Sequence, residues 1–326
     1  MQSNNSLLSI VVTSYTAERL TEIFALLNSI KMQTYPNIEL IFVIERSEKL
    51  LEEIKVYSGS IKLFNTKYIF SKDKLGLAKA RNTGIHAATG ELLAFTDDDA
   101  IPFANWAEEI VNAFSKYREI IGVTGPVFPL WENDSLSWFP EEFYWMIGCS
   151  GWKNLKTLSF SDYAWGANMS FRKDAFRNTL FKDAYTEGAQ EEGKLGPVGD
   201  DVHFSYLLKK NTGKQILFSP NVKVNHKVNI YKLSSKFIRR YSYWQGYSDS
   251  MFKNGPDAQK ERSTTEMGLL SRILLKLFPS ILKGIFRNSE LSLRKAKVTA
   301  NVLFYFLLGY VSQRVPSIAK RVRNLV

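Results

Sequence analysis

The chain has 326 residues, of which 45% are hydrophobic and 23% are charged, a composition that excludes intrinsic disorder and allows one large core or two modest ones. The lone cysteine, Cys149, excludes a disulfide within a single chain, and the first residues lack the basic stretch and apolar segment of a secretory signal. We therefore expect a reducing, cytosolic environment.

The positive charge is concentrated near the C-terminus. Residues 268–326 contain eleven lysines and arginines and one acidic residue, Glu290, so this tail carries +10 of the formal net charge of +11. A basic chain favours nucleic acid or an anionic membrane as its partner. Because the charge lies in an apolar tail, we expect an anionic membrane surface and no nucleic acid.

The first hundred residues alternate between the patterns of buried strands and amphipathic helices. Strands are expected at residues 7–13, 38–44, 68–70 and 91–96, and helices at residues 17–32 and 75–88. This alternation predicts an α/β fold with a mostly parallel central sheet and helices on its faces. Functional residues of such sheets gather where strands end, which here means after Thr13, Ile44 and Thr96.

Three carboxylates, Asp97, Asp98 and Asp99, follow the strand that ends at Thr96. Residues two apart on an extended backbone project to the same side, so Asp97 and Asp99 can converge on one ligand. Mg²⁺ and Mn²⁺ prefer carboxylate oxygens together with substrate phosphates. The alternative is a solvated turn that caps a helix beginning at Phe103.

Six ordered segments carry a resemblance to a known family. They are SIVVTSY (9–15), QTYPNIELIFV (33–43), GLAKARNTGIHAATG (76–90), FTDDDAIP (95–102), WGANMSFR (165–172) and GDDVHF (199–204). Together they resemble the family 2 glycosyltransferases of the GT-A fold. The resemblance implies a GT-A type αβα sandwich and transfer of a sugar from a nucleotide diphosphate donor, with UDP-sugars favoured.

The resemblance also implies roles for individual residues. Asp99 would hold Mn²⁺ or Mg²⁺, with His226 as a further metal ligand unless that histidine is structural. The donor would contact Thr13, Tyr15, Glu45, Arg81, Asp97, Asp98, Gly166 and Asn168. Glu45 would read the nucleobase, although the chain has Glu45-Arg46 where the family usually has two aspartates. The small residues around Gly166 are equally consistent with close strand packing.

Gly199-Asp200-Asp201 precedes a helical run at residues 202–209. An acceptor hydroxyl is a weak nucleophile, and a carboxylate that removes its proton accelerates attack by about 10²–10⁴. The resemblance identifies Asp201 as that base and implies inversion without a covalent enzyme intermediate. The alternative is that Asp200 or Asp201 caps the helix, and both roles are compatible.

Aromatic residues are frequent at 128–152, a segment that resembles archaeal transferases extending lipid-linked glycans, including hexuronic acid transferases that act on dolichyl phosphate sugars. Aromatic rings suit sugars or an isoprenoid chain, although such a cluster is also typical of a core. We therefore expect a lipid-linked or glycan acceptor. The sequence lacks the Gln-x-x-Arg-Trp signature of processive synthases, which favours transfer of one sugar per encounter.

We predict a catalytic domain at 1–250, with a nucleotide-binding half (1–100) and an acceptor half (101–250), then a linker or lid at 251–266 and a basic helical tail at 267–326. Residues 269–286 have apolar and basic faces, with Pro279 as an expected kink. Residues 298–313 are uncharged but shorter than the ~20 residues of a spanning helix. We expect peripheral or monotopic attachment at the cytoplasmic face of the membrane; the alternative is a tail packed on the core.

Two other classes of protein share some of these features. A metal-dependent nucleotidyltransferase should carry a glycine-rich triphosphate loop near its first strand, and TSYTAERL (13–20) contains no glycine. A catalytically silent membrane scaffold could dispense with Asp99 and Asp201, and both are present. The sequence predicts no oligomeric state.

Overall fold

The protein is described from a computed structural model of residues 5–63, 65–151, 156–182, 196–254, 271–315 and 317. By its internal contacts the chain divides into two compact units. The first consists of residues 1–130, 154–186 and 200–227, and the second of residues 131–153, 187–199 and 228–326. The domain ranges predicted from the sequence stay a prediction, and most of the predicted linker at 251–266 lies outside the described residues.

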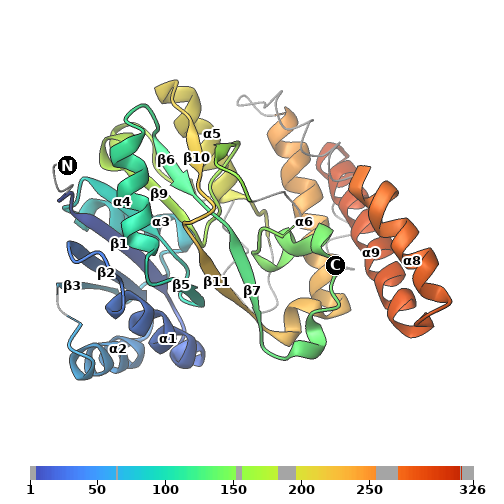
Figure 1. The fold of residues 1–326 in the computed structure, drawn as a ribbon, viewed down its shortest axis with the longest axis horizontal. Helices are drawn as coiled ribbons and strands as arrows, with labels where there is room; N and C mark the ends of the chain where they lie inside the picture. The colour runs from blue at the N-terminus through green and yellow to red at the C-terminus, as the bar shows by residue number, and fades with distance from the viewer. Residues whose placement is uncertain are drawn as a thin grey trace. The chain divides into compact units, whose positions relative to one another are not determined.

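The first unit is built on an eight-stranded sheet with the order β3-β2-β1-β4-β9-β6-β10-β8 (Figure 1). Its strands are β1 Leu8–Ser14, β2 Ile38–Glu45, β3 Thr66–Ser71, β4 Leu92–Phe95, β6 Gly122–Thr124, β8 Ser159–Ser161, β9 Met169–Arg172 and β10 Ile216–Phe218. Strands β3, β2, β1 and β4 are mutually parallel, as are β6 and β10, whereas β9 and the edge strand β8 run antiparallel to their neighbours. The predicted mostly parallel sheet is confirmed.

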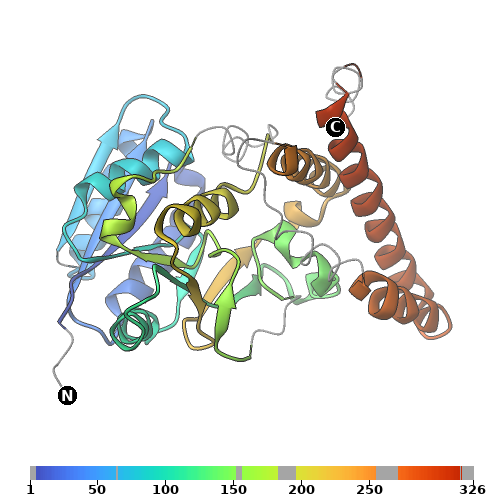
Figure 2. The same cartoon turned by 90° about the horizontal axis from the view of Figure 1, so that it is seen from above.

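Helices cover both faces of this sheet, as the turned view in Figure 2 shows. They are α1 Leu20–Lys31, α2 Glu48–Ser60, α3 Leu77–Ala87, α4 Trp106–Lys116 and α5 Asp200–Thr212, and short 3-10 helices lie at Ala17–Arg19 (η1) and Lys173–Arg177 (η4). One continuous core joins α3 and α5 to the strands, including Val11, Ile85, Phe95 and Phe204. Helix α4 begins at Trp106 rather than at the predicted Phe103, because residues 103–105 form a turn in which Phe103 accepts a hydrogen bond from the Trp106 amide.

A second sheet of three strands brings distant parts of the chain together. It has the order β5-β11-β7, with β5 Ala100–Pro102, β11 Val224–Val228 and β7 Val127–Trp131. Strand β11 runs antiparallel to β5, and this register places His226 opposite Ala100. Because Ala100 directly follows Asp99, the pairing sets His226 beside the three aspartates.

The second unit contains the C-terminal helices. They are α6 Ser235–Asn254, the π-helical stretch η7 Ile273–Leu277, α8 Phe278–Ile285 and α9 Ser289–Arg314, together with 3-10 helices at Asp134–Leu136 (η2), Glu141–Ile147 (η3) and Ile230–Leu233 (η6). The π-helical stretch ends just before Pro279, the predicted kink. Among the helices of the described ranges, none has both the length and the apolar character needed to cross a membrane.

Helices α6 and α9 pack with their backbones unusually close. A methyl group on Gly309 would lie 1.8 Å from the Tyr243 carbonyl oxygen, and one on Gly246 would lie 1.9 Å from the Phe306 carbonyl oxygen. Glycine at both positions removes the side chain that would separate the helices. Within this unit α9 therefore packs on α6 along these glycines.

Gly309→Ala tests this close approach. The added methyl group meets backbone, which can yield only if the helices move apart, so we expect a loss of about 1–3 kcal/mol and a lower midpoint of thermal unfolding. Gly59→Ala is the matched control, because a methyl group on Gly59 of α2 meets nothing within 4 Å. The control should keep or raise the midpoint. Equal midpoints for both variants would contradict the close packing.

Candidate active site

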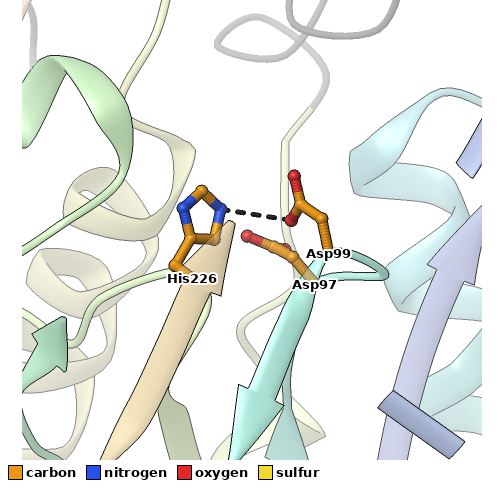
Figure 3. A group of neighbouring side chains, drawn as sticks. All are labelled: Asp97, Asp99 and His226. Carbon is orange, nitrogen blue, oxygen red and sulfur yellow. Dashed lines mark ion pairs between the residues drawn. The ribbon is translucent and has the colours of Figure 1, made fainter. Parts of the chain in front are cut away.

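The three aspartates lie in a turn at the carboxyl end of β4. The Ala100 amide donates a hydrogen bond of 3.1 Å to the Asp97 carbonyl oxygen, so the backbone turns instead of continuing as a strand. The carboxylates of Asp97 and Asp99 nevertheless lie next to one another beside His226, as Figure 3 shows. The predicted convergence of their side chains therefore occurs, but a turn produces it rather than strand alternation.

His226 completes a group of three potential metal ligands with these aspartates (Figure 3). One ligand atom from each of Asp97, Asp99 and His226 lies within 4.8 Å of the other two. The His226 Nε2 atom is 3.1 Å from Asp99 Oδ1, and the buried Nδ1 atom has no hydrogen-bond partner among the residues that the structure describes. Two carboxylates and one imidazole suit Mn²⁺ and also accept Mg²⁺, and both ions can complete their coordination with phosphate oxygens and water.

Asp98 is not part of this group and anchors the turn. Its carboxylate accepts hydrogen bonds from the Ser14 hydroxyl at 2.6 Å and from Arg19 at 2.9 Å. Burial raises the pKa of Asp98, an effect that the Arg19 charge opposes. The same Arg19 nitrogen lies 3.7 Å from Asp99 Oδ2. Arg19, which lies outside the sequence motifs, and Ser14, which lies in the first motif without an assigned role, thus hold the turn that presents Asp97 and Asp99.

Arg81 joins the aspartate turn to the Gly-Asp-Asp segment. Its guanidinium forms an ion pair with Asp200 and a second one with Asp97, at 3.3 Å from Asp97 Oδ1. Arg81 is buried on α3, and Asp200 begins α5. Asp200 is therefore engaged by a cation from another helix. Burial raises the pKa of Asp200, whereas the Arg81 charge lowers it.

Asp201 is held by two backbone amides. Its Oδ2 atom accepts a hydrogen bond of 2.9 Å from Gly166, and its Oδ1 atom accepts one of 2.8 Å from Val202. Burial and the neighbouring Asp200 charge raise the pKa of Asp201 to about 6, against the opposing effect of Arg81 and the two amides. A carboxylate with this pKa is ionised at neutral pH yet is a stronger base than an ordinary aspartate.

The sequence profile of the family described as Glycosyl transferase family 2 matches residues 9–180, more than half of the chain. The chain belongs to this family. The matched residues include Arg81, the aspartate turn and most strands of the large sheet, but not β10. Asp201 and His226 lie beyond the match but within the first structural unit.

Individual glycosyltransferases are similar to this family 2 member. It is 27% identical over 240 residues to the glucosyl-dolichyl phosphate glucuronosyltransferase of Haloferax volcanii. The aligned residues cover 74% of this chain and 75% of that protein. It is 36% identical over 112 residues to the UDP-Glc:alpha-D-GlcNAc-diphosphoundecaprenol beta-1,3-glucosyltransferase WfgD of Escherichia coli, covering 34% of this chain and 42% of WfgD. The chain is a glycosyltransferase with relatives that act on lipid-linked sugars.

A solved structure has a similar fold. The mannosyltransferase PcManGT of Pyrobaculum calidifontis, determined with GDP-Man and Mn²⁺, superposes with a TM-score of 0.60, covering 95% of this chain and 88% of that one. Because the two are 14% identical, the likeness establishes the fold alone. The predicted GT-A type architecture with C-terminal helices is confirmed.

Three further residues predicted to contact the donor, Thr13, Tyr15 and Glu45, lie at or just after the ends of β1 and β2 in this glycosyltransferase. Half-buried Thr13 lies near the end of β1, and the Arg46 guanidinium stacks 5.0 Å above the Tyr15 ring. Glu45 is buried, and its Oε2 atom accepts hydrogen bonds from the amides of Leu75 and Gly76, which precede α3.

Asn168 is engaged by the protein itself. Its side chain accepts a hydrogen bond of 2.8 Å from the Trp106 indole and donates to the carbonyl oxygens of Val222 and Pro126 at 2.8 and 3.3 Å. With only 1% of its surface exposed, Asn168 ties β9 to α4 and to two loops. The Trp165–Arg172 motif therefore contributes the Gly166 amide directly to the Asp201 side chain, and Asn168 to the surrounding scaffold.

The stability difference between Asp201→Asn and the metal-free wild type is expected to change with pH. Because the pKa of Asp201 in the fold, about 6, exceeds the ordinary 3.8, ionisation of this carboxyl weakens the folded wild type relative to its unfolded chain. This weakening is absent below about pH 4, grows up to about pH 6 and is constant above it. The thermal midpoint of wild type in EDTA should therefore fall relative to that of the variant between about pH 4 and pH 7.5. A midpoint difference that stays constant over this range would contradict the raised pKa, and exposed Asp73→Asn is the control.

Proposed function

We propose that this glycosyltransferase transfers one sugar per encounter, with inversion, from a nucleotide diphosphate sugar to a lipid-linked or glycan acceptor. UDP-sugars are the favoured donors. The observation that carries the proposal is the linked set of charges in the first unit: Arg81 pairs with Asp97 of the metal-ligand group and with Asp200, the neighbour of Asp201.

Asp97, Asp99 and His226 would hold Mn²⁺ or Mg²⁺. When bound, the cation neutralises negative charge on the diphosphate leaving group. Asp99 and His226 are buried, whereas Asp97 is one-third exposed. The exposure of Asp97 supports its role on the donor side. Asp98 is bound by Ser14 and Arg19, which fix the turn and so position Asp99.

The nucleoside side of the donor is assigned to the ends of β1 and β2. Tyr15 offers an aromatic face that Arg46 already covers on one side, and Thr13 lies two residues before it. Glu45 Oε2 accepts hydrogen bonds from two backbone amides. We assign the other carboxylate oxygen, Oε1, to accept a hydrogen bond from the nucleobase. These contacts suit a planar ring with an N–H donor, as uracil provides.

Asp201 is proposed as the general base. The Gly166 and Val202 amides fix the direction of its carboxylate, so that a lone pair can meet the acceptor hydroxyl without rearrangement. The proton passes from the hydroxyl to Asp201 while the acceptor oxygen attacks the anomeric carbon from the side opposite the diphosphate. The bond from that carbon to the diphosphate oxygen breaks, and the nucleoside diphosphate leaves with the bonding electrons. This geometry inverts the anomeric configuration and needs no covalent enzyme intermediate.

The names of the relatives support a lipid-linked acceptor. One acts on a glucosyl-dolichyl phosphate and another on a diphosphoundecaprenol-linked sugar, so both take an isoprenoid-linked glycan. We extend this acceptor class to the present chain and place its action at the cytoplasmic face of a membrane. Screening nucleotide sugars for Mn²⁺-dependent transfer to isoprenoid-phosphate-linked sugars tests the whole proposal, and transfer from no sugar nucleotide would refute it.

Asp99→Ala should remove metal-dependent donor binding. Loss of one of three protein ligands is expected to weaken Mn²⁺-dependent binding of UDP by about 100-fold, measured by titration calorimetry with and without EDTA. Asp73→Ala, at an exposed aspartate after β3, is the matched control and should bind as wild type does. Undiminished Mn²⁺-dependent binding in Asp99→Ala would rule out this metal site.

Asp201→Asn should separate chemistry from binding. Transfer is expected to fall by about 10²–10⁴, because the amide cannot accept the hydroxyl proton, while the affinity for UDP and Mn²⁺ is retained. The wild-type kcat/KM should rise with pH through about 6 and level off above it, because only the ionised Asp201 is a base. Unchanged turnover in the variant would refute the assignment of the base.

A further inference from the structure

The outward side of η7, α8 and α9 is apolar. Phe286 is 94% exposed, Leu275 75% and Phe304 62%. They belong to a set of exposed large apolar side chains that recur at helical spacing along both helices and that we call the outer face: Leu274, Leu275, Phe278, Leu282, Ile285, Phe286, Leu293, Leu303, Phe304, Leu307 and Val311. Helices α8 and α9 lie side by side in both views (Figures 1 and 2), so the outer face extends over both.

The inward side of α9 has the opposite character. Its buried residues are mostly small or polar, namely Ser292, Val298, Thr299, Val302, Gly309 and Ser312. They face partners of the same kind: Gly246 of α6 meets the α9 backbone, and the Ser250 hydroxyl lies 3.0 Å from Gln313 Oε1. A helix of a water-soluble protein buries its large apolar side chains. Small residues inside and large apolar residues outside are typical of helices that pack in lipid.

Basic side chains flank the outer face. Residues 271–315 contain eight lysines and arginines and one acidic residue, Glu290, which is paired with Arg294. Lys276, Lys283 and Arg287 are exposed and follow one another at intervals of seven and four residues, which places them along one side of the helical stretch. The outer face is thus an apolar strip with a positive border.

We propose that the outer face lies in the interface of an anionic lipid bilayer, with its apolar side chains among the acyl chains and its basic border at the headgroups. The positive charge beside the outer face favours anionic lipid over a second copy of this chain as its partner. Two copies would bring their basic residues together, whereas anionic headgroups neutralise them. Since no described helix can cross a membrane, the two helices lie along the surface. This inference deepens the proposed function, because it identifies the surface that binds the membrane in which a lipid-linked acceptor resides. Only the reason for membrane binding rests on the proposed function; the binding itself does not.

Binding to lipid vesicles tests the proposed membrane contact of the outer face. The measurement needs neither sugar donor nor acceptor, so its result does not depend on catalysis. The full chain should float with vesicles of phosphatidylcholine containing about 30 mol% phosphatidylglycerol and bind vesicles of pure phosphatidylcholine at least about tenfold more weakly. The triple variant Leu275→Ser, Phe286→Ser, Phe304→Ser should reduce the partition coefficient on anionic vesicles at least about tenfold. Its matched control is Met32→Ser, Val56→Ser, Phe160→Ser, which alters comparably exposed apolar residues of the first unit and should bind as wild type does.

Site-directed labelling supplies a second measurement that does not depend on how well the triple variant folds. The native Cys149 is buried, so Phe286→Cys and Val56→Cys can each be labelled selectively with an environment-sensitive fluorophore. On anionic vesicles the probe at 286 should shift to the blue, and the probe at 56 should not. The proposal is overturned if the probe at 286 does not respond, or if the triple variant keeps wild-type vesicle binding. It is also overturned if the outer face instead pairs two copies, so that wild type is a dimer that does not bind vesicles and the triple variant is a monomer.

Discussion

The ion pairs of buried Arg81 with Asp97 and Asp200 are the interaction on which the active site depends. Burying an ion pair costs desolvation and seldom stabilises a fold by itself, so its value here is positional. The guanidinium fixes the Gly-Asp-Asp segment relative to the aspartate turn, although more than a hundred residues separate them. Asp97, Asp99, Asp200 and Asp201 together exceed the positive charge that Arg81 and Arg19 supply. A divalent cation would offset this excess where the diphosphate adds still more negative charge.

Two buried carboxylates show how surroundings separate a base from a structural anchor. Burial acts to raise the pKa of Glu39, but hydrogen bonds from Lys67, Ser9 and Thr89 outweigh it and lower the pKa to about 2. Asp201 receives only two backbone amides and has Asp200 as its neighbour, and its pKa rises to about 6. Both lie in the same unit, and the number and charge of their donors decide the difference. Glu39 therefore holds strands together, while Asp201 retains affinity for a proton.

The four parallel strands β1 to β4 and the ligand-bearing aspartates could be predicted from the sequence, because buried parallel strands are apolar runs and the aspartates directly follow one of them. The shorter strands β5 to β11 were not predicted. Helix α2 was not predicted, although Leu50, Ile54 and Tyr57 are at helical spacing and Ser47 is the N-cap, which accepts a hydrogen bond from the Leu50 amide. The roles of Arg19 and Asp98 could not be predicted either, because they arise from a turn that local spacing does not specify. Asn168 matches a donor-binding motif, yet its hydrogen bonds go to Trp106 and to two loops, and only tertiary structure distinguishes these uses.

The tail shows a different limit of sequence interpretation. Its spacing predicts amphipathic helices, but an apolar face can be turned toward a protein core or away from it, and composition does not distinguish the two. Gly246 and Gly309 resolve the direction, because only residues without side chains allow α6 and α9 to approach at those points. Once that small-residue side of α9 is committed to α6, Leu307 and Phe304 must point outward. The backbone contact between α6 and α9 thus leaves the large apolar side chains of α9 exposed on its other side. A lipid interface suits both these apolar side chains and the basic residues that flank them.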